Sequence, residues 1–185
     1  VAVTPPEYEQ VAESQNPVVA AIGRLVPAKG FDLLIAAWES KFGYLFVVGD
    51  GPERGSLEAL VAARGLAENV FLIGHKHSAL DYIGAADLVV IPSRNEGFSY
   101  VFAEALLEKT PVISTDVPIP NEVLPKQYIC AIENVEAIHL LLKTSLSNVN
   151  RLEQSFASLF DYAEKNLTLV RSRDQTLAAY EALIE

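Results

Sequence analysis

A strand, a polar turn and a helix follow one another in the run Asp87-Leu88-Val89-Val90-Ile91-Pro92-Ser93-Arg94-Asn95-Glu96-Gly97-Phe98-Ser99-Tyr100-Val101-Phe102-Ala103-Glu104. Continuous apolar residues at 87–91 predict a buried strand, and the apolar spacing after Tyr100 predicts a helix. In parallel α/β sheets, such a turn at the carboxyl end of a strand is where ligands bind. Glu96 and Glu104 bracket the turn, and the backbone N–H groups between them form an anion site at a helix N-terminus. We therefore expect a ligand with hydroxyl groups at both ends and phosphate in the middle.

The same alternation extends to both sides of this run. Short apolar runs predict further strands at 17–23, 44–48, 70–73, 111–115 and 128–132. Helical spacing predicts helices at 31–38, 57–63, 80–83, 135–146, 151–165 and 167–183. This pattern indicates a Rossmann-like α/β fold of about six parallel strands, with helices on both faces and at the C-terminal end. Right-handed crossovers place the strand-to-helix loops at one edge of the sheet, so the loops after Ile22, Val48, Ile73 and Ile91 should converge.

Composition limits the classes of function. The chain has 185 residues, a net charge of -10 and one cysteine, Cys130. The acidic charge argues against nucleic acid or an anionic membrane as a diffuse partner, and a single cysteine excludes an internal disulfide framework. No apolar run has the length of a membrane span. Because the chain contains no methionine, we expect a fragment, with residues 1–16 as a linker and residues 17–185 as one domain.

The loop after the first strand contains two cations, Arg24 and Lys29, with Gly23 and Gly30 beside them. Glycine lets a backbone approach a ligand closely. Arginine offers a planar fork to phosphate oxygens, and lysine offers a compact charge. The loop therefore fits a diphosphate, although two surface cations in a turn would look the same. It contains no G-x-G-x-x-G dinucleotide fingerprint.

The other candidate residues leave alternatives open. Glu96 and Glu104 could accept hydrogen bonds from hydroxyl groups, act as a pair of acid and base, or bind a metal. In the structural alternative, Glu96 forms a capping box with Ser93, and Glu104 is a charge on the helix surface. His75 and His77 have a spacing compatible with a metal, but a solvated loop without metal is favoured because no third ligand is in view. Asp50 is either a turn residue or part of the cleft. Asn121-Glu122 either cap a helix or face the cleft.

Taken together, the motifs resemble the C-terminal, donor-binding domain of the retaining GT-B glycosyltransferases of family 4, the glycosyl transferases group 1. The resemblance runs from about residue 18 to residue 124. Five segments carry it: Gly23-Arg24-Leu25-Val26-Pro27-x-Lys29-Gly30, Val48-Gly49-Asp50-Gly51-Pro52, Phe71-Leu72-Ile73-Gly74, Pro92-Ser93-Arg94-x-Glu96-Gly97-Phe98 continuing to Glu104-Ala105-Leu106, and Pro111-Val112-Ile113-Ser114-Thr115-Asp116. Each is weak alone, and five in this order are specific.

The resemblance implies roles for these residues. Arg24 and Lys29, with Gly23 beside them, would bind the donor diphosphate and stabilise it as a leaving group, while Glu96 would hold the donor sugar and Glu104 the ribose. Contacts to sugar and phosphate would come from Gly97, Phe98, Ser99, Tyr100 and Val101. Gly74 and His75 would lie near the base. The implied reaction retains anomeric configuration, uses front-face transfer and needs neither a metal nor a cofactor.

The resemblance also implies what the chain lacks. In the family, an N-terminal domain supplies the acceptor site and any membrane association, and the whole enzyme acts in the cytoplasm or at the cytoplasmic face of a membrane. Two segments depart from the family pattern: Glu108-Lys109-Thr110 lacks the glycine usual before Thr-Pro, and Val117-Pro118-Ile119-Pro120-Asn121 replaces a glycine-rich loop. These departures keep a non-catalytic nucleotide-sugar-binding module as one alternative. A nucleotide-sugar epimerase of similar architecture is the other.

Overall fold

The computed structural model describes residues 5–9, 11 and 14–167. All six strands are parallel and form one sheet in the order β3-β2-β1-β4-β5-β6. The strands are β1 (Val18–Ile22), β2 (Tyr44–Val48), β3 (Val70–Gly74), β4 (Leu88–Ile91), β5 (Val112–Thr115) and β6 (Ile129–Cys130). The Rossmann-like α/β fold predicted from the alternating pattern is confirmed.

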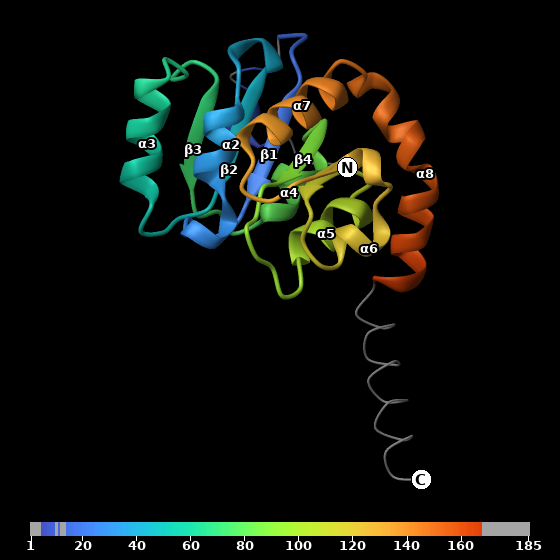
Figure 1. Cartoon of the computed structure of the whole chain (residues 1–185). Coiled ribbons are helices and arrows are strands. Elements are labelled where there is room, and N and C mark those ends of the chain that lie inside the picture. Colours follow the sequence, from blue (N-terminus) through green and yellow to red (C-terminus); the bar gives the residue numbers. More distant parts are fainter. Residues whose placement is uncertain (1–4, 10, 12–13, 168–185) are drawn as a thin grey trace.

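Helices cover both faces of this sheet. One layer contains α2 (Phe31–Ala37), α3 (Arg54–Ala63) and α7 (Val135–Leu146), in which α2 packs against the other two. The other contains α4 (Ala79–Gly84), α5 (Tyr100–Leu107) and α8 (Val149–Asn166), in which α5 packs against the other two. Figure 1 shows α3, α2 and α7 in front of the strands and α8 along one side. Shorter elements are α1 (Pro6–Glu9), α6 (Pro120–Val123) and the 3₁₀ turns η1 (Pro27–Lys29), η2 (Ser40–Phe42) and η3 (Lys126–Tyr128).

The predicted helices are found with small shifts at their ends. The helix predicted at 135–146 has those limits, and Asn134 caps it by accepting a hydrogen bond from the backbone N–H of Ala137 at 2.8 Å. The helix predicted at 151–165 lies within α8. The helix predicted at 167–183 falls, beyond Leu167, outside the described residues. No helix in the part of the chain that the structure describes is both long and apolar enough to span a membrane.

The sheet is covered by helices on both faces, which explains why its strand residues are mostly apolar and do not alternate with exposed polar ones. Ser114 and Thr115 of β5 are polar but buried. Every residue of β4 is buried, and so are Val19, Ala20 and Ala21 in the neighbouring β1. Parallel strands covered by helices on both sides have this composition. Trp38 is fully buried between the helical layer and the sheet, as expected of a core residue rather than a ligand platform.

The sixth strand is shorter than predicted. Pairing with β5 involves only Ile129 and Cys130, where the sequence predicted a strand over 128–132. Tyr128 instead ends a 3₁₀ turn and packs its ring on Phe156 of α8, with ring centroids 4.6 Å apart. After the pair, Glu133 turns the chain with a φ of 55°. A turn on each side therefore limits the strand at this edge of the sheet.

The N-terminal segment, for which the sequence predicted a linker, contains α1 and packs against the sheet. Tyr8 is buried against Phe46 of β2, with ring centroids 4.4 Å apart, and its hydroxyl donates to the backbone carbonyl of Tyr82 at 3.0 Å. Glu7 accepts hydrogen bonds from Lys76 and from the Tyr82 hydroxyl. These two donors, Lys76 above all, lower the pKa of Glu7. The segment thus covers part of the β2–β3 face that α4 leaves open.

Helix α5 ends in a Schellman motif with a lysine at its left-handed position. The N–H of Thr110 donates to the carbonyl of Ala105 at 2.8 Å, and the N–H of Lys109 donates to the carbonyl of Leu106 at 3.2 Å. Lys109 has a φ of 62°. The resemblance led us to expect a glycine in this segment, and Lys109 adopts the left-handed backbone conformation that glycine favours.

We expect Lys109→Gly to raise the free energy of unfolding by about 0.5–1 kcal/mol, because glycine avoids the left-handed penalty but makes the unfolded chain more flexible. Urea denaturation of the two proteins measures the difference. Lys109→Ala is the matched control: it keeps the Cβ atom while also removing the exposed Lys109–Glu164 ion pair, an interaction of little value. A similar gain for the alanine variant would contradict the backbone explanation.

Candidate functional site

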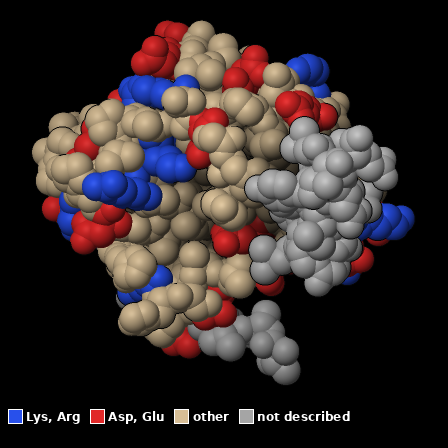
Figure 2. Space-filling model, turned by 90° about the horizontal axis from the view of Figure 1, so that it is seen from below, with Lys and Arg blue, Asp and Glu red and all other residues tan. Residues whose placement is uncertain are grey.

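Four loops meet at the carboxyl edge of the sheet, as the crossover rule predicted. Backbone hydrogen bonds join them in series: Gly23 N–H donates to Val48, Gly49 N–H donates to Gly74, and Arg94 N–H donates to Ala28, at 3.0, 2.9 and 2.8 Å. Figure 2 looks onto this edge and shows a hollow with several Lys and Arg side chains on one side of it and Asp and Glu side chains close by. The convergence brings together residues that are up to about 70 positions apart in the chain.

The centre of this edge lies between β1 and β4, where the strand order reverses. The chain leaves β3, crosses to the other face and returns as β4 beside β1, so α2 and α5, which follow β1 and β4, lie on opposite faces. In folds of this kind, ligands bind in the crevice at such a switch point. Lys29 reaches across it from the β1 loop, and its Nζ donates to Glu96 Oε1 at 2.6 Å. Ser93 Oγ donates to the same oxygen at 2.8 Å. This Ser93–Glu96 contact joins two side chains and is not a capping box, because no helix begins at Ser93 and the following helix, α5, has Ser99 at its N-cap.

The close approach of the two loops depends on Gly30, which has a φ of 66°. A Cβ atom at this position would lie 2.1 Å from the backbone oxygen of Pro92, the residue after β4. The backbone of the β1 loop therefore touches the backbone of the β4 loop, and only glycine fits between them. This contact sets the width of the crevice in which Lys29 and Glu96 meet.

A pocket of about 400 Å³ adjoins the crevice on the β2 and β3 side, and it is lined by Ile22, Gly23, Arg24, Val48, Gly49, Asp50, His75, Lys76 and Ala79. The side chain of Arg24 is exposed there, and within residues 5–9, 11 and 14–167 it belongs to no ion pair. Gly74 lies immediately before His75. The sequence left Asp50 as either a turn or a cleft residue, and it is both: its carboxylate accepts from the N–H of Gly51 at 2.8 Å.

The N-terminus of α5 follows the β4 loop, and its first N–H groups include those of Tyr100 and Phe102, which donate to the carbonyls of Phe98 and Ser99 at 3.1 Å. Ser99 is buried at its N-cap and makes no side-chain capping bond, while Val101 is half-buried against the core. Phe98 and Tyr100 are 48% and 69% exposed and meet edge to face with ring centroids 5.0 Å apart. Gly97 is exposed, and a Cβ atom there would touch nothing within 4 Å. The polar turn is thus open on its outer side.

Glu104 lies on α5 and is half-buried. Burial raises the pKa of its carboxyl group, because a charged form loses hydration there. A carboxylate that is poorly hydrated gains more from a hydroxyl donor than an exposed one does. The two glutamates of the motif therefore differ: Glu96 has a lysine partner, whereas Glu104 belongs to no ion pair within residues 5–9, 11 and 14–167.

The structure separates the two histidines of the β3 loop. His75 lines the pocket and His77 is not among its lining residues, although both side chains are exposed and their rings meet edge to face with centroids 6.2 Å apart. Among the described residues, no group of three or more His, Cys, Asp or Glu side chains could hold a metal ion. Asn121 is bonded to Lys126, and Glu122 is exposed on α6, so neither lies among the residues that line the pocket.

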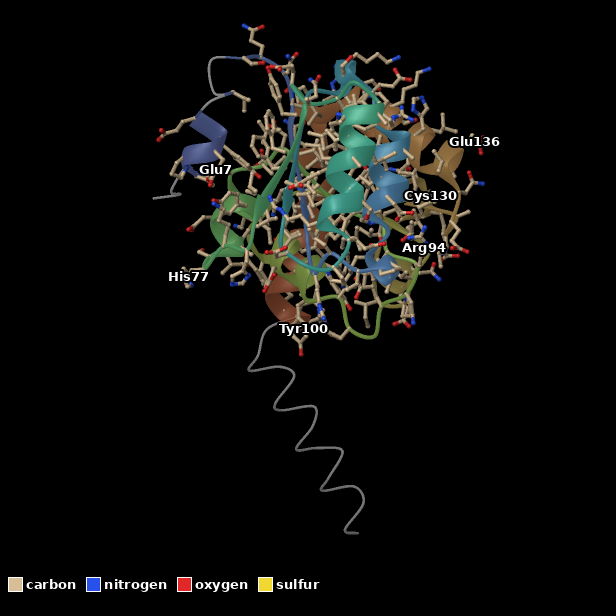
Figure 3. The ribbon with its side chains drawn as sticks, turned by 90° about the vertical axis from the view of Figure 1, so that its left-hand side faces the viewer. Glu7, His77, Arg94, Tyr100, Cys130 and Glu136 are labelled. Carbon is tan, nitrogen blue, oxygen red and sulfur yellow. The ribbon has the colours of Figure 1, made fainter. Side chains whose placement is uncertain are left out.

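Sequence reasoning missed Lys76, which lines the pocket and holds Glu7, and gave no role to Arg94. In Figure 3, Arg94 lies beside the start of α2, at the opposite end of the loop edge from His77, and Tyr100 lies at the lowest point of the folded part. The Arg94 guanidinium makes paired hydrogen bonds of 2.7 Å to both oxygens of Asp32. This pairing lowers the pKa of the Asp32 carboxyl. No signal in the sequence joins these two residues, which are 62 positions apart.

Comparison with known proteins agrees with this geometry. Residues 7–157 match the family model of the glycosyl transferases group 1. The chain is 37% identical over 100 residues to the lipopolysaccharide core biosynthesis glycosyltransferase LpsE of Rhizobium meliloti, covering 54% of this chain and 29% of LpsE. It is 29% identical over 145 residues to the O-antigen biosynthesis glycosyltransferase WclY of Escherichia coli, covering 77% of this chain and 41% of WclY. The chain therefore spans less than half the length of these relatives.

Among solved structures, the fold matches Anabaena HepE in complex with UDP, with a TM-score of 0.84, 21% identity, and coverage of 97% of this chain and 54% of HepE. At this identity, the match shows the fold alone. The family model, in contrast, covers most of the chain and includes all four loops of the site. The chain belongs to the glycosyl transferases group 1.

Proposed function

We propose that this chain is the donor-binding part of a glycosyltransferase that moves a sugar from a nucleotide-diphosphate sugar to an acceptor with retention of anomeric configuration. The observation that carries the proposal is the Lys29–Glu96 pair, which joins a phosphate-binding type of cation to a hydroxyl-binding type of carboxylate across the crevice at 2.6 Å. A sugar diphosphate has these two kinds of group next to each other.

The positions of the other residues support a model in which different residues along this edge of the sheet bind the sugar, the diphosphate, the ribose and the base of the donor. Arg24 and Lys29 would neutralise the diphosphate, assisted by the N–H groups at the start of α5. Glu96 would accept from hydroxyls of the sugar and Glu104 from those of the ribose. The base would occupy the pocket beside Gly74 and His75, whose volume of about 400 Å³ is within the usual range of small-molecule sites, roughly 300–1,000 Å³.

This arrangement favours a reaction driven by charge stabilisation and positioning. As the bond between sugar and diphosphate breaks, negative charge grows on the leaving phosphate, where two cations and aligned backbone dipoles would stabilise it. We propose that neither a metal nor a cofactor takes part, with Arg24 and Lys29 supplying the positive charge. A further domain would bind the acceptor, and the whole enzyme would act in the cytoplasm or at the cytoplasmic face of a membrane.

The names of related proteins support the choice of ligand and pathway class. HepE has been crystallised with UDP and with UDP-glucose, and Staphylococcus aureus TarM has been crystallised with UDP. LpsE and WclY are named for lipopolysaccharide core and O-antigen biosynthesis. We therefore propose a polysaccharide as the product and a uridine nucleotide as the first ligand to test.

Calorimetric titration with UDP, GDP, ADP and their sugar conjugates tests the donor site. We expect one of the three nucleotides to bind. We also expect its sugar conjugate to bind, with Glu96 contributing to the affinity for the sugar. A folded chain that binds none of them would contradict the proposal. Incubating the full-length enzyme with donor alone separates transfer from epimerisation, because only an epimerase would return a changed donor sugar.

A further inference from the structure

Arg94 connects its own loop to the turn 27–32 and to Glu133 in the turn before α7. Its guanidinium donates twice to the Asp32 carboxylate in the first turn of α2, both at 2.7 Å, and to the backbone oxygen of Pro27 in η1 at 2.8 Å. Its Nε donates to Glu133, in the turn before α7, at 3.0 Å. The Arg94 side chain is only 24% exposed, which is low for an arginine at a loop edge.

The residues that Arg94 holds lie on either side of Lys29. Pro27 precedes Lys29 by two positions and Asp32 follows it by three, so the guanidinium spans the backbone turn from which the lysine projects. The Arg94 N–H also donates to the carbonyl of Ala28 at 2.8 Å. Two residues further along the chain, Glu96 accepts from Lys29 itself at 2.6 Å. The segment 94–96 therefore contacts both the backbone around Lys29 and the ammonium group at the end of its side chain.

We propose that Arg94 is a positioning residue for the diphosphate group of the donor: it fixes the turn 27–32 so that Lys29 points into the crevice beside Glu96. The inference rests on the proposed function, because it assigns Arg94 a task in that same site. A lysine at position 94 could not perform it, since only the planar guanidinium serves two carboxylate oxygens and a backbone carbonyl at once.

A role limited to surface stability is the competing explanation. Glu133 is 68% exposed at its side chain, and ion pairs of that kind contribute little. The Asp32 and Pro27 contacts differ because they are made by one guanidinium in a fixed geometry on two sides of a turn. A merely stabilising arginine would change the free energy of unfolding but would leave the affinity for a phosphate ligand unchanged in the folded protein.

Titration with UDP separates these explanations. We expect Arg94→Gln to raise the Kd for UDP about tenfold, because a misplaced Lys29 would no longer form one charge-assisted hydrogen bond to the phosphates. The same substitution in a Lys29→Met background should have little further effect, because the residue on which Arg94 acts is already gone. Arg94→Lys should recover little of the affinity. Arg64→Gln is the matched control, since Arg64 also donates to a backbone carbonyl, that of Trp38 at 3.1 Å, but from the far end of α3; its Kd should equal that of the wild type.

Amide hydrogen exchange gives a second measurement that needs no ligand. The N–H groups of Lys29, Gly30 and Leu33 are bonded within the turn, and we expect them to exchange faster in Arg94→Gln than in the wild type or Arg64→Gln. If the wild type binds none of UDP, GDP and ADP, the donor assignment fails while the exchange rates still decide the role of Arg94; if it binds GDP or ADP, that nucleotide replaces UDP in the titrations. Unchanged exchange at these amides, an unchanged Kd, or full additivity with Lys29→Met would each overturn the inference.

Discussion

Gly30→Ala is expected to lower the free energy of unfolding by about 3 kcal/mol, the sum of a left-handed backbone penalty and the cost of displacing a packed backbone. The Cβ atom would lie 2.1 Å from the backbone oxygen of Pro92, a distance that no side-chain rotation can relieve. The β1 and β4 loops would have to separate, which would also widen the crevice between Lys29 and Glu96. We therefore expect a weaker nucleotide site in any Gly30→Ala protein that still folds.

Urea denaturation measures this loss, and Gly65→Ala provides a matched control. Gly65 has nearly the same backbone conformation, with a φ of 64°, but a Cβ atom there meets nothing within 4 Å. Its replacement should cost only the backbone term, about 1 kcal/mol. The difference between the two variants then gives the cost of pushing the two loops apart. Equal losses would contradict a tight contact between Gly30 and Pro92.

Lys29→Met is expected to weaken UDP binding by roughly 10- to 150-fold, which corresponds to the loss of charge-assisted hydrogen bonds to phosphate. The Lys29 ammonium has three N–H donors, so it can keep its bond to Glu96 while donating to a phosphate oxygen. Glu96, whose side chain is 9% exposed, therefore orients the lysine before the ligand arrives. Methionine keeps an unbranched apolar side chain of nearly the same length and removes the charged ammonium group with its three donors.

Calorimetry at low ionic strength measures this change, and Lys41→Met is the control. Lys41 pairs with Glu39 in the η2 segment, and both side chains are exposed. Because it lies at the opposite edge of the sheet, its loss should leave the Kd for UDP unchanged. If the two variants bound UDP equally well, Lys29 would not contact the phosphates. Circular dichroism of both variants excludes unfolding as the cause of a loss.

The sequence specified the sheet well because the evidence for each strand is local. Five apolar runs bounded by glycine, proline or polar residues coincide with strands, and the loops at their carboxyl ends converge as right-handed crossovers require. The same holds for the helix at 135–146, because its apolar spacing and its capping residue, Asn134, are both local features of the sequence. Local pattern and tertiary structure agree at these positions.

What escaped prediction depends on contacts between distant residues. The burial of Tyr8 follows from the open face beside Phe46, 38 positions away in the sequence, and no local pattern around residue 8 indicates it. The short β6 follows from the packing of Tyr128 on Phe156. In the site, the Lys29–Glu96 pair joins two motifs that the sequence offered separately, and the Arg94–Asp32 pair joins a motif residue to one outside any motif.

The backbone contacts between loops decide where this site can change during evolution or in a designed library. Gly49 is restricted in the same way as Gly30, because a Cβ atom at Gly49 would lie 1.8 Å from the backbone oxygen of Gly23. Substitutions at these glycines therefore displace the backbones of the loops that form the site. Exposed side chains on the same edge, such as His77 and Tyr100, have no such restriction. Randomising these open positions should yield mostly folded proteins, whereas the same number of changes at the glycines should yield few.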